Sequence, residues 1–119
     1  MAEARQMLTL ADVEAVIEAS RKRPVLVFKH STRCPISAAA HREWRAFLAS
    51  PEADRADHFW VRVVQERPVS LALAGRVGVV HQSPQALLIK DGRAVWHDSH
   101  YGITAGRLKA ALDQAAGQG

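Results

Sequence analysis

The alternation of apolar and polar positions in the first part of the chain predicts one helix followed by one buried strand. Apolar residues recur at helical spacing from about Leu10 to Ser20. Thr9 directly precedes this stretch, and together with Asp12 three residues later it fits a capping box. Four consecutive apolar residues follow at Val25–Phe28. Such a run is typical of a strand that is buried on both faces of a sheet.

A second helix and a second strand are expected in the middle of the chain. Pro35 suits the first turn of a helix, where its missing N–H costs nothing, and the helix should end before Pro51. One face of this helix is apolar, and its members are Ile36, Ala40, Trp44, Phe47 and Leu48. The residues Phe59–Val64 then predict a strand, and Val69–Arg76 a short helix. Either Gly75 or Gly78 would end that short helix.

The last third of the chain predicts a hairpin and a final helix. Asp91-Gly92 is a strong hairpin turn between the apolar runs Ala86–Ile89 and Ala94–Trp96. Thr104 can cap a helix in which apolar residues share one face, namely Leu108, Leu112 and Ala115.

These elements form a βαβ unit followed by a ββα unit, which is the thioredoxin arrangement. We therefore expect a single thioredoxin-like α/β domain over residues 1–119, a length that suits one hydrophobic core. Its central mixed sheet should hold about four strands, with helices on both faces.

Charge and composition narrow the function classes. The chain has a net charge of +4 and a pI of about 9.8, but its sixteen basic residues are scattered apart from the short run Arg21–Arg23. This distribution does not favour nucleic-acid binding. The chain also has no apolar run of membrane-spanning or secretory-signal length. A lone cysteine can form no internal disulfide, which agrees with a cytoplasmic location. We therefore expect a cytoplasmic protein that binds no membrane, and we expect it to be a monomer.

Cys34, the single cysteine, lies in a polar segment between the first expected strand and the second expected helix. A lone cysteine can be a small buried apolar residue, but this setting favours a reactive one. A cysteine reacts as its thiolate, and a helix N-terminus favours that anion through its unpaired N–H groups and its dipole. Nearby basic residues add positive charge, and a serine in the first turn could donate a hydrogen bond to the sulfur. The residues expected to support the thiolate are Pro35, Ser37, Arg33 and Lys29, with His30 adding charge.

Two short strings carry a resemblance to a known family. The motif C-P-I-S at residues 34–37 resembles the C-x-x-C motif of thioredoxins and glutaredoxins with serine in place of the second cysteine. The longer string H-S-T-R-C-P-I-S at residues 30–37 is similar to that of the monothiol bacilliredoxins (YtxJ-like proteins). The resemblance extends to residues 83–85 and 99–104, and little of it falls between about residues 51 and 82.

The resemblance implies a reaction and a set of binding residues. Cys34 would be the nucleophile that attacks a mixed disulfide between a cytosolic protein and bacillithiol, the low-molecular-weight thiol of some bacteria. Pro84 would be a cis-proline facing that cysteine, and the backbone of Ser83 would pair with the substrate. Thr32 and His100 complete the implied substrate-binding residues. Bacillithiol would be a co-substrate, and no tightly bound cofactor is expected.

Serine at position 37 affects how the reaction of Cys34 can end, and two alternatives to the enzymatic function stay open. With serine there, a mixed disulfide on Cys34 cannot close internally, so a second thiol must release it. A non-catalytic redox sensor or thiol-binding module modified at Cys34 would need the same cysteine. A more distant alternative is an iron–sulfur carrier of the monothiol glutaredoxin kind, whose motif usually reads C-G-F-S.

No metal is expected, because His30 and Cys34 supply only two candidate ligands.

Overall fold

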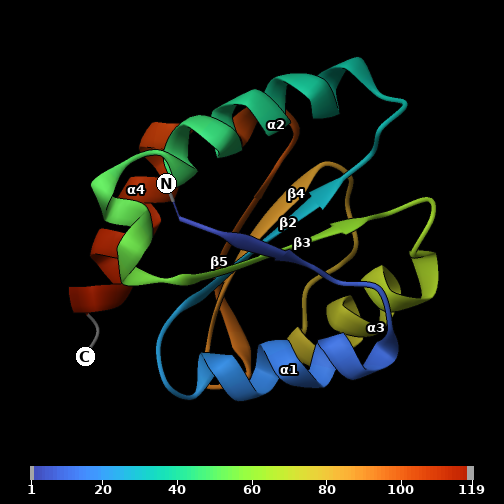
Figure 1. The fold of residues 1–119 in the computed structure, drawn as a ribbon, viewed down its shortest axis with the longest axis horizontal. Coiled ribbons are helices and arrows are strands. Elements are labelled where there is room, and N and C mark those ends of the chain that lie inside the picture. The colour runs from blue at the N-terminus through green and yellow to red at the C-terminus, as the bar shows by residue number, and fades with distance from the viewer. Residues whose placement is uncertain (1, 118–119) are drawn as a thin grey trace.

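The computed structural model describes residues 2–117 of the chain, which form five strands and four α-helices (Figure 1). The strands are β1 (Ala4–Gln6), β2 (Val25–His30), β3 (Asp57–Arg62), β4 (Gln85–Lys90) and β5 (Arg93–Ser99). The helices are α1 (Leu10–Ser20), α2 (Pro35–Leu48), α3 (Arg67–Val77) and α4 (Ala105–Gly117). Two short 3₁₀ helices, η1 (Pro51–Arg55) and η2 (His100–Gly102), follow α2 and β5.

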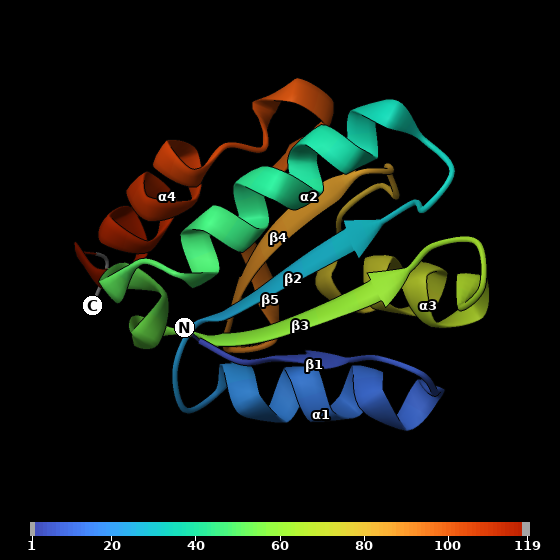
Figure 2. The same ribbon diagram turned by 45° about the horizontal axis from the view of Figure 1, so that its top comes forward.

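The strands form one mixed sheet in the order β1-β3-β2-β4-β5. The first three strands of that order are parallel, while β4 runs antiparallel to β2 and β5 antiparallel to β4. Helices α1 and α3 cover one face of the sheet, and α2 and α4 cover the other (Figures 1 and 2). The α/β class with helices on both faces is therefore confirmed.

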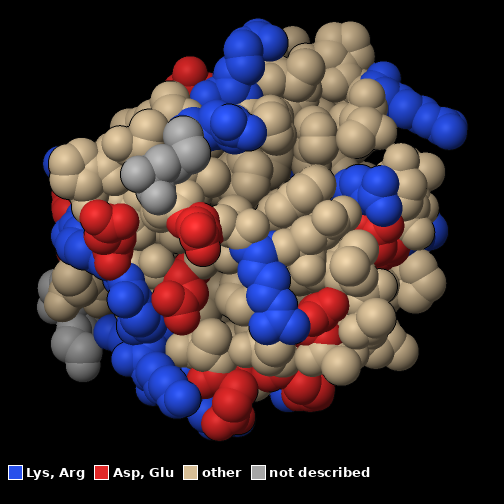
Figure 3. Space-filling view, viewed as in Figure 1, with Lys and Arg blue, Asp and Glu red and all other residues tan. Residues whose placement is uncertain are grey.

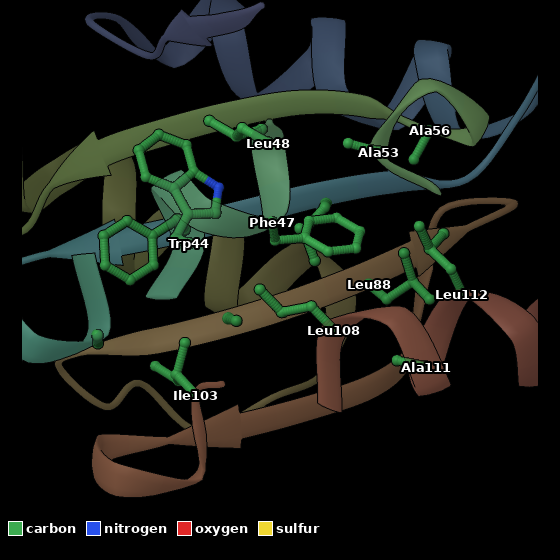
Figure 4. Packing of buried hydrophobic residues seen from close by; sticks show 14 of the residues in the cluster. Trp44, Phe47, Leu48, Ala53, Ala56, Leu88, Ile103, Leu108, Ala111 and Leu112 are labelled. Carbon is green, nitrogen blue, oxygen red and sulfur yellow. The ribbon is translucent and has the colours of Figure 1, made fainter. Parts of the chain in front are cut away.

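Each face of the sheet has its own hydrophobic core, because successive side chains of a strand point to opposite faces. In β2, Leu26 and Phe28 pack toward α2 and α4, whereas Val25 and Val27 pack toward α1 and α3. Figure 4 shows the first core, in which residues of α2 and α4 meet over the sheet. Full burial of a large apolar side chain stabilises the fold by about 1.5–3 kcal/mol. The residues predicted for the apolar faces of α2 and α4 all belong to this core except Ile36, which is only partly buried.

The sequence pattern does not predict β1, so the sheet has five strands where about four were expected. Ala4–Gln6 is three residues long and has no alternation of apolar and polar side chains. Its hydrogen-bonded partner is β3, where Ala4 lies opposite His58 and Gln6 opposite Trp60. Tertiary pairing, rather than local preference, makes this segment a strand. The strand β3 also begins and ends two residues earlier than the expected Phe59–Val64.

The predicted helix ends are confirmed at three places. The backbone N–H of Thr9 donates to the Asp12 carboxylate at 3.0 Å, which closes the N-terminus of α1. The helix α3 ends at Gly78, whose φ of 76° lies in the left-handed region, and not at Gly75. The Thr104 hydroxyl oxygen accepts the N–H of Arg107 at 3.1 Å and caps α4.

Among residues 2–117, none of the helices has the length and apolar character needed to cross a bilayer. On the face shown in Figure 3, basic side chains adjoin one another along the lower left, with acidic side chains beside them, and the two kinds are interspersed elsewhere.

Candidate active site

Cys34 is the N-cap residue of α2 and is partly exposed. Pro35 occupies the first helical position, as the sequence predicts, and the Cys34 carbonyl accepts the N–H of Ala38 at 3.1 Å. The sulfur therefore stands at the end of the helix where backbone N–H groups lack helical partners. This placement favours an anion at the sulfur and leaves it accessible to a second sulfur.

The sheet topology brings the Ser83-Pro84 segment to the same edge as Cys34. The strand β2 ends at His30, and its neighbour β4 begins at Gln85, which lies opposite Lys29. The Ser83–Pro84 bond that directly precedes β4 is cis, as the resemblance implied. Ser83 is partly exposed, and its buried hydroxyl has no hydrogen-bond partner in the described part of the chain.

His100 reaches the same edge from the end of β5. Its backbone N–H donates to the carbonyl of Pro84 at 3.1 Å, and its side chain is exposed. Its φ of 55° places a residue other than glycine in the left-handed region, at a cost of about 1 kcal/mol. Strained residues of this kind concentrate at functional sites. Thr32 is exposed on the other side of Cys34, where its hydroxyl accepts a hydrogen bond from Gln65 at 3.5 Å.

Ser37 is not placed as the sequence suggests. Its side chain is fully buried, and its hydroxyl oxygen accepts the N–H of Ser31 at 2.9 Å. The same oxygen lies 2.8 Å from Nδ1 of His30. In residues 2–117 no hydrogen bond joins this hydroxyl to the sulfur of Cys34. Ser37 instead ties the end of β2 to the first turn of α2.

Lys29 does not stand beside Cys34, so the expectation that it supports the thiolate is wrong. Strand residues alternate between faces, and Lys29 follows Val25 and Val27 onto the face covered by α1 and α3. Its buried ammonium group donates to the carbonyl of Ser70 and to Nδ1 of His81, each at 3.1 Å. His81 precedes the cis peptide bond by only a few residues, so its hydrogen bond with Lys29 connects β2 to the loop that carries Pro84.

The other two basic residues near Cys34 in the sequence, Arg33 and His30, differ in exposure and in charge. Arg33 is exposed and forms no ion pair with any described acidic residue, and its support of the thiolate stays a prediction. His30 is half-buried, and burial together with His41 lowers its pKa. It therefore adds little positive charge at neutral pH, contrary to the sequence-based expectation.

Sequence reasoning missed the aromatic surroundings of His30. The rings of His30 and His41 stack with their centroids 4.7 Å apart, and Phe28 stacks on His30 at 5.6 Å. Trp44 continues the row against Phe28 at 4.9 Å. The signal is present in the sequence, since His41 and Trp44 lie three residues apart on α2 and such neighbours can touch, but only Trp44 belongs to the predicted apolar face.

No group of three or more histidine, cysteine, aspartate or glutamate side chains lies close enough to hold a metal ion in residues 2–117. What the described residues assemble is one accessible cysteine at a helix N-terminus, a cis-proline at the neighbouring strand and a strained histidine beside it. This arrangement is suited to the approach of a disulfide to Cys34.

Solved structures of similar shape identify the fold. A thioredoxin-fold protein is 37% identical in sequence, with a TM-score of 0.79 over 91% of this chain and 92% of that chain. Fasciola hepatica thioredoxin is 22% identical, with a TM-score of 0.70 over 92% of this chain and 97% of that chain. Malassezia sympodialis thioredoxin (Mala s 13) is 16% identical, with a TM-score of 0.75 over 96% and 91% of the two chains.

The predicted thioredoxin-like fold is therefore confirmed. A family model described as "Monothiol bacilliredoxin BrxC" matches residues 5–108, which include Cys34, Pro84 and His100. Its match covers most of the chain and agrees with the resemblance of residues 30–37. The fold, the single cysteine at a helix N-terminus and this match assign the chain a thiol redox function and place it in the monothiol bacilliredoxin BrxC family.

Proposed function

We propose that this protein removes bacillithiol from mixed disulfides on other proteins, with Cys34 as the nucleophile. The observation that carries the proposal is a single accessible cysteine at the N-cap of α2, with a buried serine at the position of a resolving thiol. Because no other cysteine is present, each exchange must be completed by a thiol from outside the chain. The name of the matched family, monothiol bacilliredoxin, supports bacillithiol as that thiol.

The proposed cycle has two exchange steps. In the first, the Cys34 thiolate attacks the bacillithiol sulfur of the mixed disulfide, a new S–S bond forms, and the target cysteine leaves as a thiolate. In the second, the thiolate of a free bacillithiol attacks the same bacillithiol sulfur, and Cys34 leaves as a thiolate. The target protein is thereby reduced by two electrons, and two bacillithiol molecules end as their disulfide. The cycle needs no tightly bound cofactor or metal.

The surface around Pro84 supports a protein as the substrate. Val80, which precedes the cis bond, and Tyr101, which follows His100, are 80% and 75% exposed. Exposed apolar side chains close in the chain to Pro84 and His100 suit contact with a polypeptide. The backbone of Ser83 would pair with that polypeptide, as the family resemblance implies, while Thr32 and His100 flank the disulfide.

A turnover experiment separates the enzyme from a sensor that is modified once. A bacillithiolated model protein in large excess is incubated with this protein and free bacillithiol, and released target thiol is counted per Cys34. We expect many equivalents, because the outside thiol regenerates Cys34. Release that stops at one equivalent would identify a sensor and contradict the proposal. Replacing bacillithiol by glutathione should slow the second step, since the proposal assigns that step to bacillithiol.

A further inference from the structure

The loop that leads to Pro84 has few contacts of its own. It spans residues 78–84, between α3 and β4, and contains no helix or strand. Val79 packs against the core beneath α1 and α3, but Val80 is exposed. Within residues 2–117, the backbone of residues 80–83 forms no hydrogen bond with another backbone group. The hydrogen bonds that hold this stretch come instead from buried side chains of the neighbouring strands.

Two buried polar side chains, Lys29 on β2 and Gln85 on β4, contact the loop, and they lie opposite each other in the sheet. The amide nitrogen of Gln85 donates to the carbonyl of Val80 at 3.1 Å, and its amide oxygen accepts the N–H of Gln82 at 3.4 Å. The ammonium group of Lys29 donates to Nδ1 of His81 at 3.1 Å. Consecutive residues of the loop are thus fixed by two side chains from outside it.

Lys29 also connects the loop to α3. Its ammonium group donates to the carbonyl of Ser70 at 3.1 Å, and the hydroxyl of Ser70 lies 3.4 Å from Nδ1 of His81. Burial lowers the pKa of Lys29 to about 8, so at pH 7 the group still carries its charge. Burial, Lys29 and Arg67 lower the pKa of His81, so its ring is neutral and Nδ1 can accept. A charged donor makes both hydrogen bonds of Lys29 stronger than neutral ones.

The chemistry of Cys34 does not explain why a charged group is buried at this position. Burial of an ammonium group is costly, and a well-packed apolar side chain of similar volume would serve stability as well. Since one partner of Lys29 belongs to α3 and the other to the loop, what its hydrogen bonds add is the position of the loop relative to the sheet.

We propose that Lys29 is a positioning residue for the protein substrate, which through His81 holds the loop before Pro84 in the conformation that receives the mixed disulfide. The loop ends in the cis Ser83–Pro84 bond, at the edge of the sheet where Cys34 lies. Lys29 itself touches neither the substrate nor the sulfur. The inference rests on the proposed function for the pairing of Ser83 with the substrate, but it does not depend on which small thiol the target carries.

The test is the first exchange step at pH 7, followed by mass spectrometry as transfer of bacillithiol from a bacillithiolated model protein to Cys34. In Lys29→Met we expect the second-order rate constant of transfer to fall about fivefold to tenfold, the effect of one hydrogen bond to a charged group. Alkylation of Cys34 by iodoacetamide should keep the wild-type rate, because this small reagent does not need the loop. Lys22→Met, at an exposed lysine, is the matched control and should leave both rates unchanged.

Two variants of His81 separate the hydrogen bond from the packing of the ring. His81→Asn keeps an acceptor close to the place of Nδ1, whereas His81→Leu fills the space without one. We expect the asparagine variant to transfer bacillithiol at close to the wild-type rate and the leucine variant to share the loss seen in Lys29→Met. Equal rates in the two His81 variants would contradict a role for the Lys29–His81 hydrogen bond.

Hydrogen–deuterium exchange of the loop amides gives a readout that needs no substrate. In Lys29→Met the amides of residues 80–83 should exchange faster than in the wild type, while those of α2 keep their protection. Unchanged transfer and unchanged loop exchange in Lys29→Met would overturn the inference, even if bacillithiol removal were confirmed. If wild-type Cys34 takes up no bacillithiol, the proposed function fails. Faster loop exchange in Lys29→Met would then still support the contact of Lys29 with the loop, and unchanged exchange would overturn it.

Discussion

Replacement of Cys34 by serine is expected to lower the rate of bacillithiol removal by at least about a thousandfold. The serine hydroxyl is not ionised near neutral pH and cannot form the disulfide intermediate with bacillithiol. The fold should be unaffected, because Cys34 is an N-cap residue and serine is among the best residues at that position. The rate is measured as target thiol released from a bacillithiolated model protein under conditions where the wild type turns over many times.

A thermal unfolding curve of Cys34→Ser provides the control for this prediction. Its midpoint should equal or slightly exceed that of the wild type, so that lost activity cannot be ascribed to lost structure. If the serine variant kept more than about a tenth of the wild-type rate, Cys34 would not be the nucleophile, since removal of a covalent nucleophile has far larger effects. The cycle proposed for this chain would then be wrong.

The second large effect concerns Lys29, whose ammonium group is fully buried. Burial lowers the pKa of Lys29 from 10.5 to about 8. Between those two pH values the unfolded chain holds a proton that the folded chain has released, so the free energy of unfolding should rise with pH across that window. Below pH 8 both states are protonated, and the folded state is less stable by about 3 kcal/mol than it would be with an unshifted lysine. Denaturation in urea at several pH values measures this rise.

The variant Lys29→Met should abolish the rise, because methionine fills a similar volume and does not titrate. Its stability at neutral pH should stay close to that of the wild type, since it removes both the cost of burial and the hydrogen bonds to Ser70 and His81. Lys22→Met, at an exposed lysine, is the matched control and should retain the wild-type pH profile. A Lys29→Met curve with the same rise as the wild type would show that Lys29 is not its source.

Most of the fold could be predicted from the sequence because its elements carry strong local signals. The buried run of β2, the Asp91-Gly92 turn and the caps at Thr9 and Thr104 each specify an element by patterning or by hydrogen bonding within a few residues. The edge strand β1 has no such signal, since three residues with polar members become a strand only when β3 offers a partner.

The site was predictable in its chemistry but not in its detailed contacts. Cys34 and Pro35 follow from their sequence positions, since a proline at the first helical position places the preceding residue at the helix N-terminus. Lys29 is close to Cys34 along the chain yet lies on the opposite face of the sheet, because each strand residue reverses side. The partner of Ser37 could not be predicted, since the approach of His30 depends on how the loop between them folds.

The role of Cys34 as the acceptor of bacillithiol can be observed by intact-protein mass spectrometry during turnover of a bacillithiolated protein. We expect Cys34 to gain one bacillithiol in disulfide linkage while the target protein loses it. Addition of free bacillithiol should then restore the original mass of this chain as bacillithiol disulfide accumulates. Release of the target thiol with no adduct ever present on Cys34, or an adduct that free bacillithiol does not remove, would show that this chain does not carry bacillithiol on Cys34 as proposed.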